Sequence, residues 1–544
     1  MVSDGSNMNQ NVAAAAHHPL ASHPSPGKLP LMLFGAIVIV ALAYIGVSLT
    51  GDLATTRDTS WLPFVLLGIA LLIALGFEFV NGFHDTANAV ATVIYTHSLA
   101  PNTAVVWSGT WNFLGVMASS GAVAYGIISL LPVELILQVG SGAGFAMVFA
   151  LLIAAIIWNL GTWYLGLPAS SSHTLIGSII GVGLANQLLA TSGTATSGVD
   201  WNQALNIGKS LLFSPIIGFA AAAMLLVTLK ILVKNAALFK APQGKKPPPL
   251  WIRSILILTC TGVSFAHGSN DGQKGMGLIM LILIGTVPTV YALNRAMEPG
   301  RIQAFSGDGQ AVSQVLSSRL GAQPPAAISD EEARGRVATY VRTRTFEPAT
   351  TLPGLIQMVH AIDSQAASYK TFANIPTEKV SNVRNDMYLV SEAFRYLLKQ
   401  KPIAMNGDEE KVIKTYRSGL DHATKFIPIW VKVAVALALG LGTMVGWKRI
   451  VVTVGEKIGK THLTYGQGAS AELVAMTTIG AADLLGLPVS TTQVLSSGVA
   501  GTMAANGSGL QWATVRNLLL AWVLTLPASI LLSGFLFWLF RFLF

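Results

Sequence analysis

The chain has 544 residues, of which 52% are hydrophobic and 11% are charged. Because a soluble domain carries roughly 25% charged residues, this composition indicates a membrane protein with many spans. The net charge of +9 does not indicate nucleic-acid binding, because the basic residues collect in loops beside apolar runs, where they meet anionic lipid. The single cysteine, Cys260, excludes a disulfide framework and a cysteine-based metal site.

Four regions follow one another along the chain. Residues 1–29 are rich in Ala, His, Ser and Pro, which predicts a disordered N-terminal tail. Residues 30–293 and 426–544 consist mainly of apolar runs, and the first run is too long for a signal peptide, so it is predicted to remain as a span. Residues 294–425 lack such a run and predict a soluble helical insertion, with helical spacing of apolar residues over 380–398. The expected fold is an all-α polytopic membrane protein with about 11–12 apolar segments, some of them re-entrant or broken.

Two loops rich in Lys and Arg, residues 230–253 and 448–460, are both predicted to face the cytoplasm. That arrangement requires an even number of crossings between them, yet three apolar runs intervene. Several glycines surround Asp271, and irregular backbone at membrane depth is tolerated only where it is buried or lines a cavity. We therefore predict that the chain around Asp271 dips into the membrane and returns.

Residues 81–92, NGFHDTANAVAT, place ionisable groups in an apolar run, where they are costly and therefore indicate function. A second stretch, HGSNDGQKGMGL at residues 267–278, aligns with the first so that Asp85 matches Asp271. The two carboxylates are predicted to approach one another near mid-membrane, where their oxygens suit Na⁺, Mg²⁺ or Ca²⁺, or carry protons. They are the candidate metal ligands. The other predicted members of this coupling site are Asn81, His84, Asn88, Asn270, Gln273 and Lys274.

A second pair of matching stretches is rich in hydroxyl groups. LGLPASSSHTLIGS at residues 165–178 matches LLGLPVSTTQVLSS at residues 484–497. In each, a proline ends one helix and hydroxyls cap the next, whose free N–H groups and positive dipole end suit an anion. A simpler alternative is that the hydroxyls only cap or bond within buried helices, but their recurrence in both halves favours a cradle for a tetrahedral oxyanion. The predicted cradle residues are Ser170, Ser171, Ser172, Thr174, Ser490, Thr491 and Thr492.

The two halves are expected to be inverted in the membrane, because about five crossings, an odd number, separate Asp85 from Asp271. The region 30–293 then holds an extra span, the first repeat and the start of the second repeat. The rest of the second repeat follows the insertion, at residues 426–544. Inverted repeats around a site at mid-membrane are typical of secondary transporters.

The chain resembles the inorganic phosphate transporter (Pit) family, and within it the bacterial low-affinity metal-phosphate:proton symporters. The resemblance rests on NGFHDTANAVATVIYT, IIWNLGTWY, LPASSSHTLIG, NDGQKG and LPVST, and it covers most of residues 62–540 apart from the insertion. It implies an inverted-repeat transporter, commonly a homodimer, that imports phosphate with protons or sodium ions. The bacterial symporters take phosphate as a neutral complex with a divalent metal. Glu472 resembles a carboxylate of the sodium-coupled members and joins the predicted coupling residues.

Four positions depart from the sodium-coupled pattern. His84 and Lys274 replace asparagines, Asn112 stands at the place of a second glutamate, and Gln493 stands at that of a histidine. Because a fixed ammonium at Lys274 occupies the space of a cation, these departures favour proton coupling.

Alternatives to this function are a sodium-coupled phosphate symporter, a sulfate permease of the same fold and, less favoured, a membrane-embedded phosphatase with His173 beside Ser172. GEKIGKT at residues 455–461 has too few residues between its glycines for a nucleotide-binding loop. We expect no enzyme activity and no cofactor other than a co-transported Mg²⁺ or Ca²⁺. The expected location is the bacterial inner membrane.

Overall fold

The computed structural model describes residues 28–54, 62–85, 87–137, 140–190, 198–244, 246–320 and 328–543. Within these ranges the chain forms helices and one isolated bridge between Gly459 and Leu510, but no strand. The predicted disordered tail lies outside the described residues, apart from its last two, which begin helix α2 (Lys28–Leu53). The all-α fold class is confirmed.

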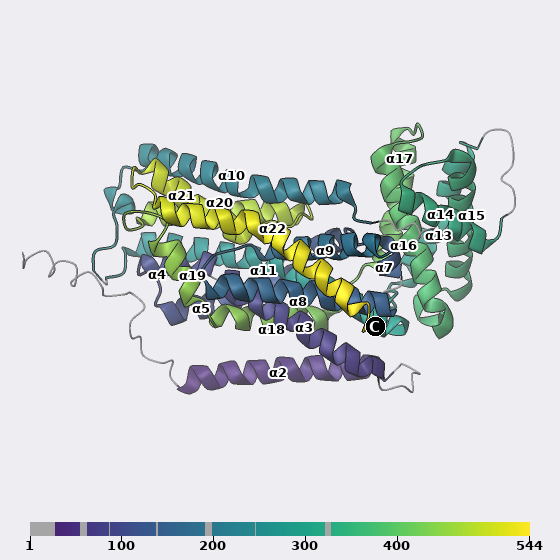
Figure 1. Ribbon diagram of the computed structural model, residues 1–544, viewed down its shortest axis with the longest axis horizontal. Helices are drawn as coiled ribbons and strands as arrows, with labels where there is room; N and C mark the ends of the chain where they lie inside the picture. Colours follow the sequence, from purple (N-terminus) through teal and green to yellow (C-terminus); the bar gives the residue numbers. More distant parts are fainter. Residues whose placement is uncertain are drawn as a thin grey trace, which may run out of the picture.

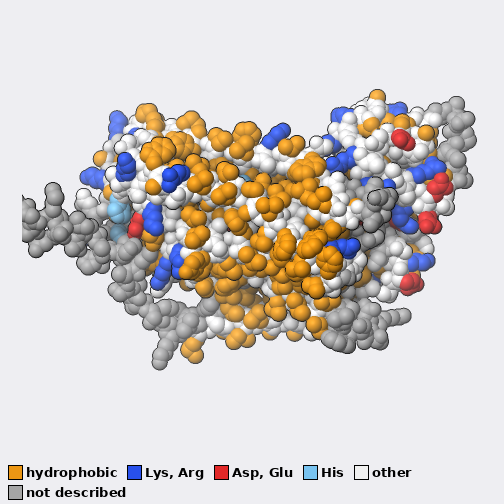
Figure 2. All heavy atoms as spheres, viewed as in Figure 1, with side chains coloured by type: hydrophobic (Ala, Val, Ile, Leu, Met, Phe, Trp, Pro, Cys, Tyr) orange, Lys and Arg blue, Asp and Glu red, His pale blue; other side chains and the backbone are white. Residues whose placement is uncertain are grey.

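Apolar helices make up most of the body of the molecule. Among the described residues, six helices are long and apolar enough to cross a membrane, or up to eight if each of two bent helix pairs counts as one span. Many of the helices run along the long axis (Figure 1). Hydrophobic side chains cover the middle of the surface, whereas charged side chains gather toward its two ends (Figure 2). Such a surface is expected of a protein surrounded by lipid.

The membrane core consists of two halves that repeat one order of elements. The first half comprises α3 (Leu62–Asp85), α4 (Ala87–Tyr95), α5 (Pro101–Ala118), α6 (Ala122–Ile128), α7 (Val133–Leu137), the hairpin of α8 (Gly142–Tyr164) and α9 (Ser171–Leu188), and α10 (Trp201–Leu232). After the 3-10 helix η1 (Ala236–Phe239), the second half comprises α11 (Leu250–Thr286), α18 (Ile429–Met444), α19 (Lys448–Glu456), the hairpin of α20 (Tyr465–Leu484) and α21 (Thr491–Ala505), and α22 (Trp512–Phe540).

The two halves are inverted and interlocked. The α8–α9 hairpin enters the core from the end that carries the insertion, and the α20–α21 hairpin enters from the opposite end (Figure 1). Helix α9 packs along α22, and α10 packs along α21, so each half supplies the long helix that covers the hairpin of the other. The tips meet where the Ser172 hydroxyl donates to the Val489 carbonyl at 2.6 Å. The predicted inverted repeat is confirmed.

Both hairpin tips turn in the same way. Gly166 and Gly486 adopt left-handed backbone angles, with φ of 68° and 65°, and each is followed by a Leu-Pro pair. The next helix then begins at a serine cap: the Ser170 hydroxyl accepts from the His173 N–H at 3.2 Å, and the Ser490 hydroxyl accepts from the Gln493 N–H at 3.2 Å. Glycine tolerates the left-handed turn, and serine satisfies one of the free N–H groups at the helix start.

The predicted dip around Asp271 is wrong, because the glycine-rich stretch lies inside one continuous helix of 37 residues, α11. The two apolar runs on either side of Asp271 are therefore a single span. Among the described helices, α11 and α18 then cross between the two basic loops, an even number. These loops lie at the same end of the molecule, where the Tyr465 N–H donates to the Lys240 carbonyl at 3.3 Å (Figure 1). A glycine weakens a helix by about 1 kcal/mol relative to alanine, but a buried backbone still needs its hydrogen bonds.

The insertion forms a helical module at the other end of the molecule, beyond the apolar surface (Figures 1 and 2). After the short α12 (Pro288–Tyr291), it comprises α13 (Pro299–Ser317), α14 (Asp330–Thr343), α15 (Pro348–Tyr369), the 3-10 helix η2 (Phe372–Asn374), α16 (Thr377–Gln400) and α17 (Gly407–Thr424). Stacked rings of Phe305 and Tyr416 pack at its centre. The helix expected over 380–398 lies within α16.

Candidate functional site

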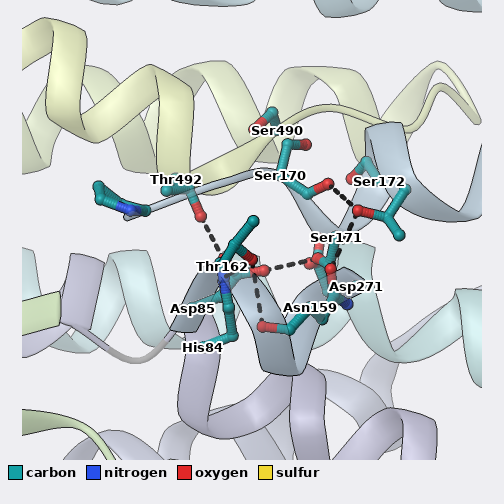
Figure 3. Close-up of polar contacts among 12 residues, drawn as sticks. His84, Asp85, Asn159, Thr162, Ser170, Ser171, Ser172, Asp271, Ser490 and Thr492 are labelled. Carbon is teal, nitrogen blue, oxygen red and sulfur yellow. Dashed lines mark hydrogen bonds and ion pairs between the residues drawn. The ribbon is translucent and has the colours of Figure 1, made fainter. Parts of the chain in front are cut away.

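Asp85 lies between the two hairpin tips (Figure 3). The hydroxyl of Ser171, in the first turn of α9, donates to Asp85 Oδ2 at 2.6 Å. The hydroxyl of Thr492, in the first turn of α21, donates to Asp85 Oδ1. Asp85 is 2% exposed. One buried carboxylate therefore joins the helix starts of both halves.

Asp271 and Lys274 form a second charged centre beside the first. Lys274 Nζ lies 2.7 Å from Asp271 Oδ2, and neither side chain is exposed. The same ammonium donates to the Ser172 hydroxyl at 2.6 Å. An isolated buried charge costs several kcal/mol of desolvation, so the pair offsets a cost that either ion alone would carry. It also places a positive charge against the first hairpin tip.

His84 is held between Asp85 and α8. Its Nδ1 lies 3.4 Å from Asp85 Oδ1, and its Nε2 lies 3.1 Å from the Thr162 hydroxyl. The sequence prediction included His84 but missed Thr162, although Thr162 belongs to the motif IIWNLGTWY on which the family resemblance partly rests. The two contacts fix the orientation of the imidazole ring.

The two aspartates approach closely enough to share a cation. Asp85, His267 and Asp271 each offer one ligand atom within 4.8 Å of the others. His267 Nε2 lies 3.5 Å from Asp271 Oδ2, and its Nδ1 lies 2.9 Å from Asn112 Oδ1. The sequence prediction missed His267, although it aligns with Asn81 when Asp271 is laid over Asp85. Carboxylate oxygens suit Mg²⁺ and Ca²⁺, and imidazole nitrogen suits transition metals.

The hydroxyls of the predicted cradle have different partners. Ser170 and Ser490 cap their helices, and Thr174 donates to Asn159 Oδ1 at 3.0 Å and to the Ser170 carbonyl at 2.9 Å, so it bonds within its own half. Ser171, Ser172 and Thr492 reach the charged centres. Thr491 is buried, and its hydroxyl has no hydrogen-bond partner in the described part of the chain.

Several buried polar atoms near the charged centres also have no hydrogen-bond partner among the described residues. They include Oε1 of Glu78 and the side-chain amide oxygens of Asn81 and Asn270. The other atoms of these amides are used, because Asn81 Nδ2 donates to Glu78 Oε2 at 3.4 Å and Asn270 Nδ2 donates to the Leu487 carbonyl at 3.1 Å. Buried polar groups are normally paired, so these acceptors are available to a cation or to a protonated ligand.

Two predicted coupling residues lie elsewhere. Gln273 accepts from the Val123 N–H at 2.9 Å and donates to Asp483 Oδ1 at 2.6 Å, which ties α11 to α6 and α20. Glu472 accepts from the hydroxyls of Thr92 and Thr259. Thr259 precedes Asp271 in α11 by about 18 Å along the helix axis, at 1.5 Å per residue, so Glu472 is a separate centre. The side chain of Asn88 lies outside the described residues.

Two inverted halves whose hairpin tips meet at a buried, charged site define a membrane transporter. The chain belongs to the phosphate transporter family, which it matches over residues 81–533. The family predicted from the sequence motifs is confirmed. Two further predictions are confirmed as well: the protein is a transporter and not an enzyme, and it is a multi-pass protein of the bacterial inner membrane.

Close relatives have similar lengths. The low-affinity inorganic phosphate transporter PitA of Escherichia coli (strain K12) is 44% identical over 493 residues, which cover 87% of this chain and 96% of the relative. The transporter PitB of the same organism is 41% identical over 491 residues, with 87% and 96% covered. The low-affinity inorganic phosphate transporter of Buchnera aphidicola subsp. Acyrthosiphon pisum (strain APS) is 40% identical over 489 residues, with 88% and 97% covered.

Proposed function

We propose that the protein imports inorganic phosphate in symport with protons, and that the phosphate binds as a neutral complex with a divalent cation such as Mg²⁺ or Ca²⁺. The observation that carries this proposal is the meeting of both hairpin tips at Asp85, with the Lys274 ammonium on the Ser172 hydroxyl beside it. Helix starts, hydroxyls and an ammonium favour an oxyanion.

The same place also suits a cation, which supports a neutral complex as the cargo. Asp85, Asp271 and His267 offer ligand atoms close together, while the hydroxyls and Lys274 stand on the side of the hairpin tips. A bare phosphate would meet two carboxylates at this site, and like charges repel strongly in a low-dielectric interior. A metal-phosphate complex brings its own positive charge to them.

Proton coupling is supported by the ion pair of Lys274 and Asp271. The ammonium already neutralises one carboxylate, so the site needs no sodium ion there, and a proton that moves between buried carboxylates can accompany the cargo. The two hairpins then provide the movement. Because they enter from opposite ends and meet at their tips, tilting one against the other would open the site to one side at a time.

The test is uptake of labelled phosphate into proteoliposomes, with and without a pH gradient, Mg²⁺ or Na⁺. We expect uptake to require the pH gradient and the divalent cation but no sodium. Asp85→Asn and Asp271→Asn should each abolish it while the protein remains folded, because each removes a site carboxylate. Near-normal uptake in either variant would refute the shared site. Competition by sulfate would favour the sulfate permease, and a requirement for sodium would favour the sodium-coupled symporter.

We also propose a homodimer, which the family resemblance implies. Size-exclusion chromatography with light scattering of the detergent-solubilised protein should give twice the mass of one chain, after correction for detergent. A monomer that retains full uptake in proteoliposomes would contradict it.

A further inference from the structure

A cavity of about 500 Å³ lies where the module meets the membrane core. Helices α16 and α17 form its module wall, and α6 with the connection that precedes it, together with the start of α10, forms its core wall. Positive and negative side chains lie side by side on its module wall. They are Arg395, Arg417, Lys425, Glu392 and Asp421, and none of them belongs to the site at the hairpin tips.

The charged side chains of this cavity differ in how closely they are paired. Arg395 lies 2.7 Å from Glu392 and 3.0 Å from Asp200, and Lys425 lies 2.7 Å from Asp421. Arg417 has only a loose contact, 3.7 Å from Asp421, and its buried Nε has no hydrogen-bond partner in the described part of the chain. A distance of 3.7 Å is too long for a hydrogen bond. Arg417 is therefore the least tightly paired of the three cations that line the cavity.

The floor of the cavity touches the second hairpin tip. Gly126 and Ala122, which line the cavity, pack against the backbone of Gly486 at that tip. The neighbouring Val123 N–H donates to Gln273 Oε1 at 2.9 Å, and Gln273 precedes Lys274 in α11. One layer of backbone thus separates the cavity from the tip of the hairpin that carries Thr491 and Thr492.

We propose that this cavity is a second binding station for the cargo, a hydrogen phosphate together with its divalent cation, on the module side of the transport site. The phosphate is held by Arg417 and Lys425, and the cation is held by Asp421 and Glu392. The proposal rests on the proposed function, because it assigns the same cargo to the cavity.

The mixed charge of the cavity identifies this ligand class. An arginine fork and a lysine match the oxygens of phosphate, and carboxylates match Mg²⁺ or Ca²⁺. A neutral complex can exchange partners with the existing ion pairs, Lys425 with Asp421 and Arg395 with Glu392, without leaving a charge uncompensated. A cavity built for a bare anion would not need the two carboxylates.

The test uses the absence of exposed cysteine among the described residues, since Cys260 is buried. Ser418→Cys places a thiol on the wall of the cavity, and Thr415→Cys places one on an exposed position of the same helix outside it. The rate of maleimide labelling is measured on the full-length protein in detergent, with phosphate plus MgCl₂ or with chloride at equal ionic strength. Both variants are made with and without Asp85→Asn, which disables the transport site.

We expect phosphate plus Mg²⁺ to slow labelling of the Ser418→Cys variant about fivefold at roughly four times the Kd, by the factor 1 + [L]/Kd. The protection should persist with Asp85→Asn, disappear with Arg417→Gln, and be absent in Thr415→Cys. Equal labelling rates with and without phosphate, in protein that still takes up phosphate, would overturn the second station and leave the proposed function standing. Equal protection at both cysteine positions would also overturn it, because the effect would then be global.

Discussion

Lys274 supplies a positive charge to the buried site. It is a fully buried lysine with two partners, Asp271 Oδ2 at 2.7 Å and the Ser172 hydroxyl at 2.6 Å, which belong to different halves of the chain. In the alignment of the two halves, Asn88 stands at the matching position. The Lys274 ammonium therefore gives the second half a positive charge that the first half lacks at the matching position.

Lys274→Asn should weaken phosphate uptake in sodium-free buffer, and added Na⁺ should partly restore it, because the substitution leaves Asp271 without its fixed cation. Uptake into proteoliposomes at several sodium concentrations measures this. Lys414→Asn, which removes an exposed lysine of the module, is the control for loss of charge. If the Lys274→Asn variant stays proton-driven at the parent rate and ignores sodium, Lys274 serves only as a structural ion-pair partner.

A separate prediction concerns the hydroxyls of the cradle. The double variant Ser171→Ala and Thr491→Ala should raise the KM for phosphate by tenfold or more, since a hydrogen bond to a charged group contributes roughly 1.5–3 kcal/mol. Ser178→Ala is the matched control, because its hydroxyl donates to the Thr174 carbonyl of its own helix. An unchanged KM in the double variant would show that these two hydroxyls do not bind the phosphate.

Among the elements, α5 and α11 cross so closely that glycine is required at the contact. A Cβ atom on Gly115 would lie 2.8 Å from the Ser269 backbone nitrogen, and one on Gly268 would lie 2.8 Å from the Asn112 backbone. Membrane helices associate through such small residues. This contact fixes the position of α11, and with it Asp271.

Gly115→Leu should therefore reduce the yield of folded protein and lower its thermal stability, because the side chain would push α5 away from the backbone of α11. Gly68→Leu is the control, since nothing lies within 4 Å of the Cβ position there. Fluorescence-detected size-exclusion chromatography after heating reports both variants. Equal stability of the two would mean that the contact between α5 and α11 is loose.

At the scale of the whole molecule, the module is fastened to the core at the start of α10. Asp200 caps α10 by accepting from the Gln203 N–H at 3.1 Å, and it also accepts from Arg395 and the Tyr396 hydroxyl of α16, both at 3.0 Å. These positive and polar partners keep the pKa of Asp200 below its ordinary value, against the opposing effect of its burial. Since α10 covers the second hairpin, the module and the transport site are mechanically connected.

Asp363 should make the stability of the module depend on pH. Burial raises the pKa of this carboxyl from 3.8 to about 7, although the Tyr416 hydroxyl that bonds it opposes the rise. The folded module thus binds this proton more tightly than the unfolded chain, so its contribution to stability is complete below pH 3.8 and is lost as the pH rises through about 7.

The Asp363→Asn variant should remove this pH dependence and melt at a higher temperature than the parent at neutral pH, because no charge is then buried. The temperature at which trypsin begins to cut α17, which carries Lys411, Lys414 and Arg417, reports the change when it is measured from about pH 5 to pH 8. Glu331→Gln, in the exposed first turn of α14, should leave the pH profile as it is. A parent profile without slope would show that Asp363 is not buried in solution.

The sequence by itself determined the class of protein and pointed to candidate residues for its site. Apolar runs show which segments lie in lipid, and polar residues that recur in two matching stretches, Asp85 with Asp271 and Ser170–Ser172 with Ser490–Thr492, stand out because such residues are costly there. The hairpin turns could also be predicted from the sequence, because the Gly-Leu-Pro-x-Ser pattern acts on the local backbone.

Only the tertiary structure decided which residues meet. The continuity of α11 through its glycines depends on the backbone of α5 beside it, and no local pattern contains that neighbour. In the same way, His267 joins the two aspartates, while Gln273 and Glu472 bond elsewhere, because each contact joins residues far apart in the chain. Residue types set what a side chain can bind, but helix packing sets the distance at which it does so.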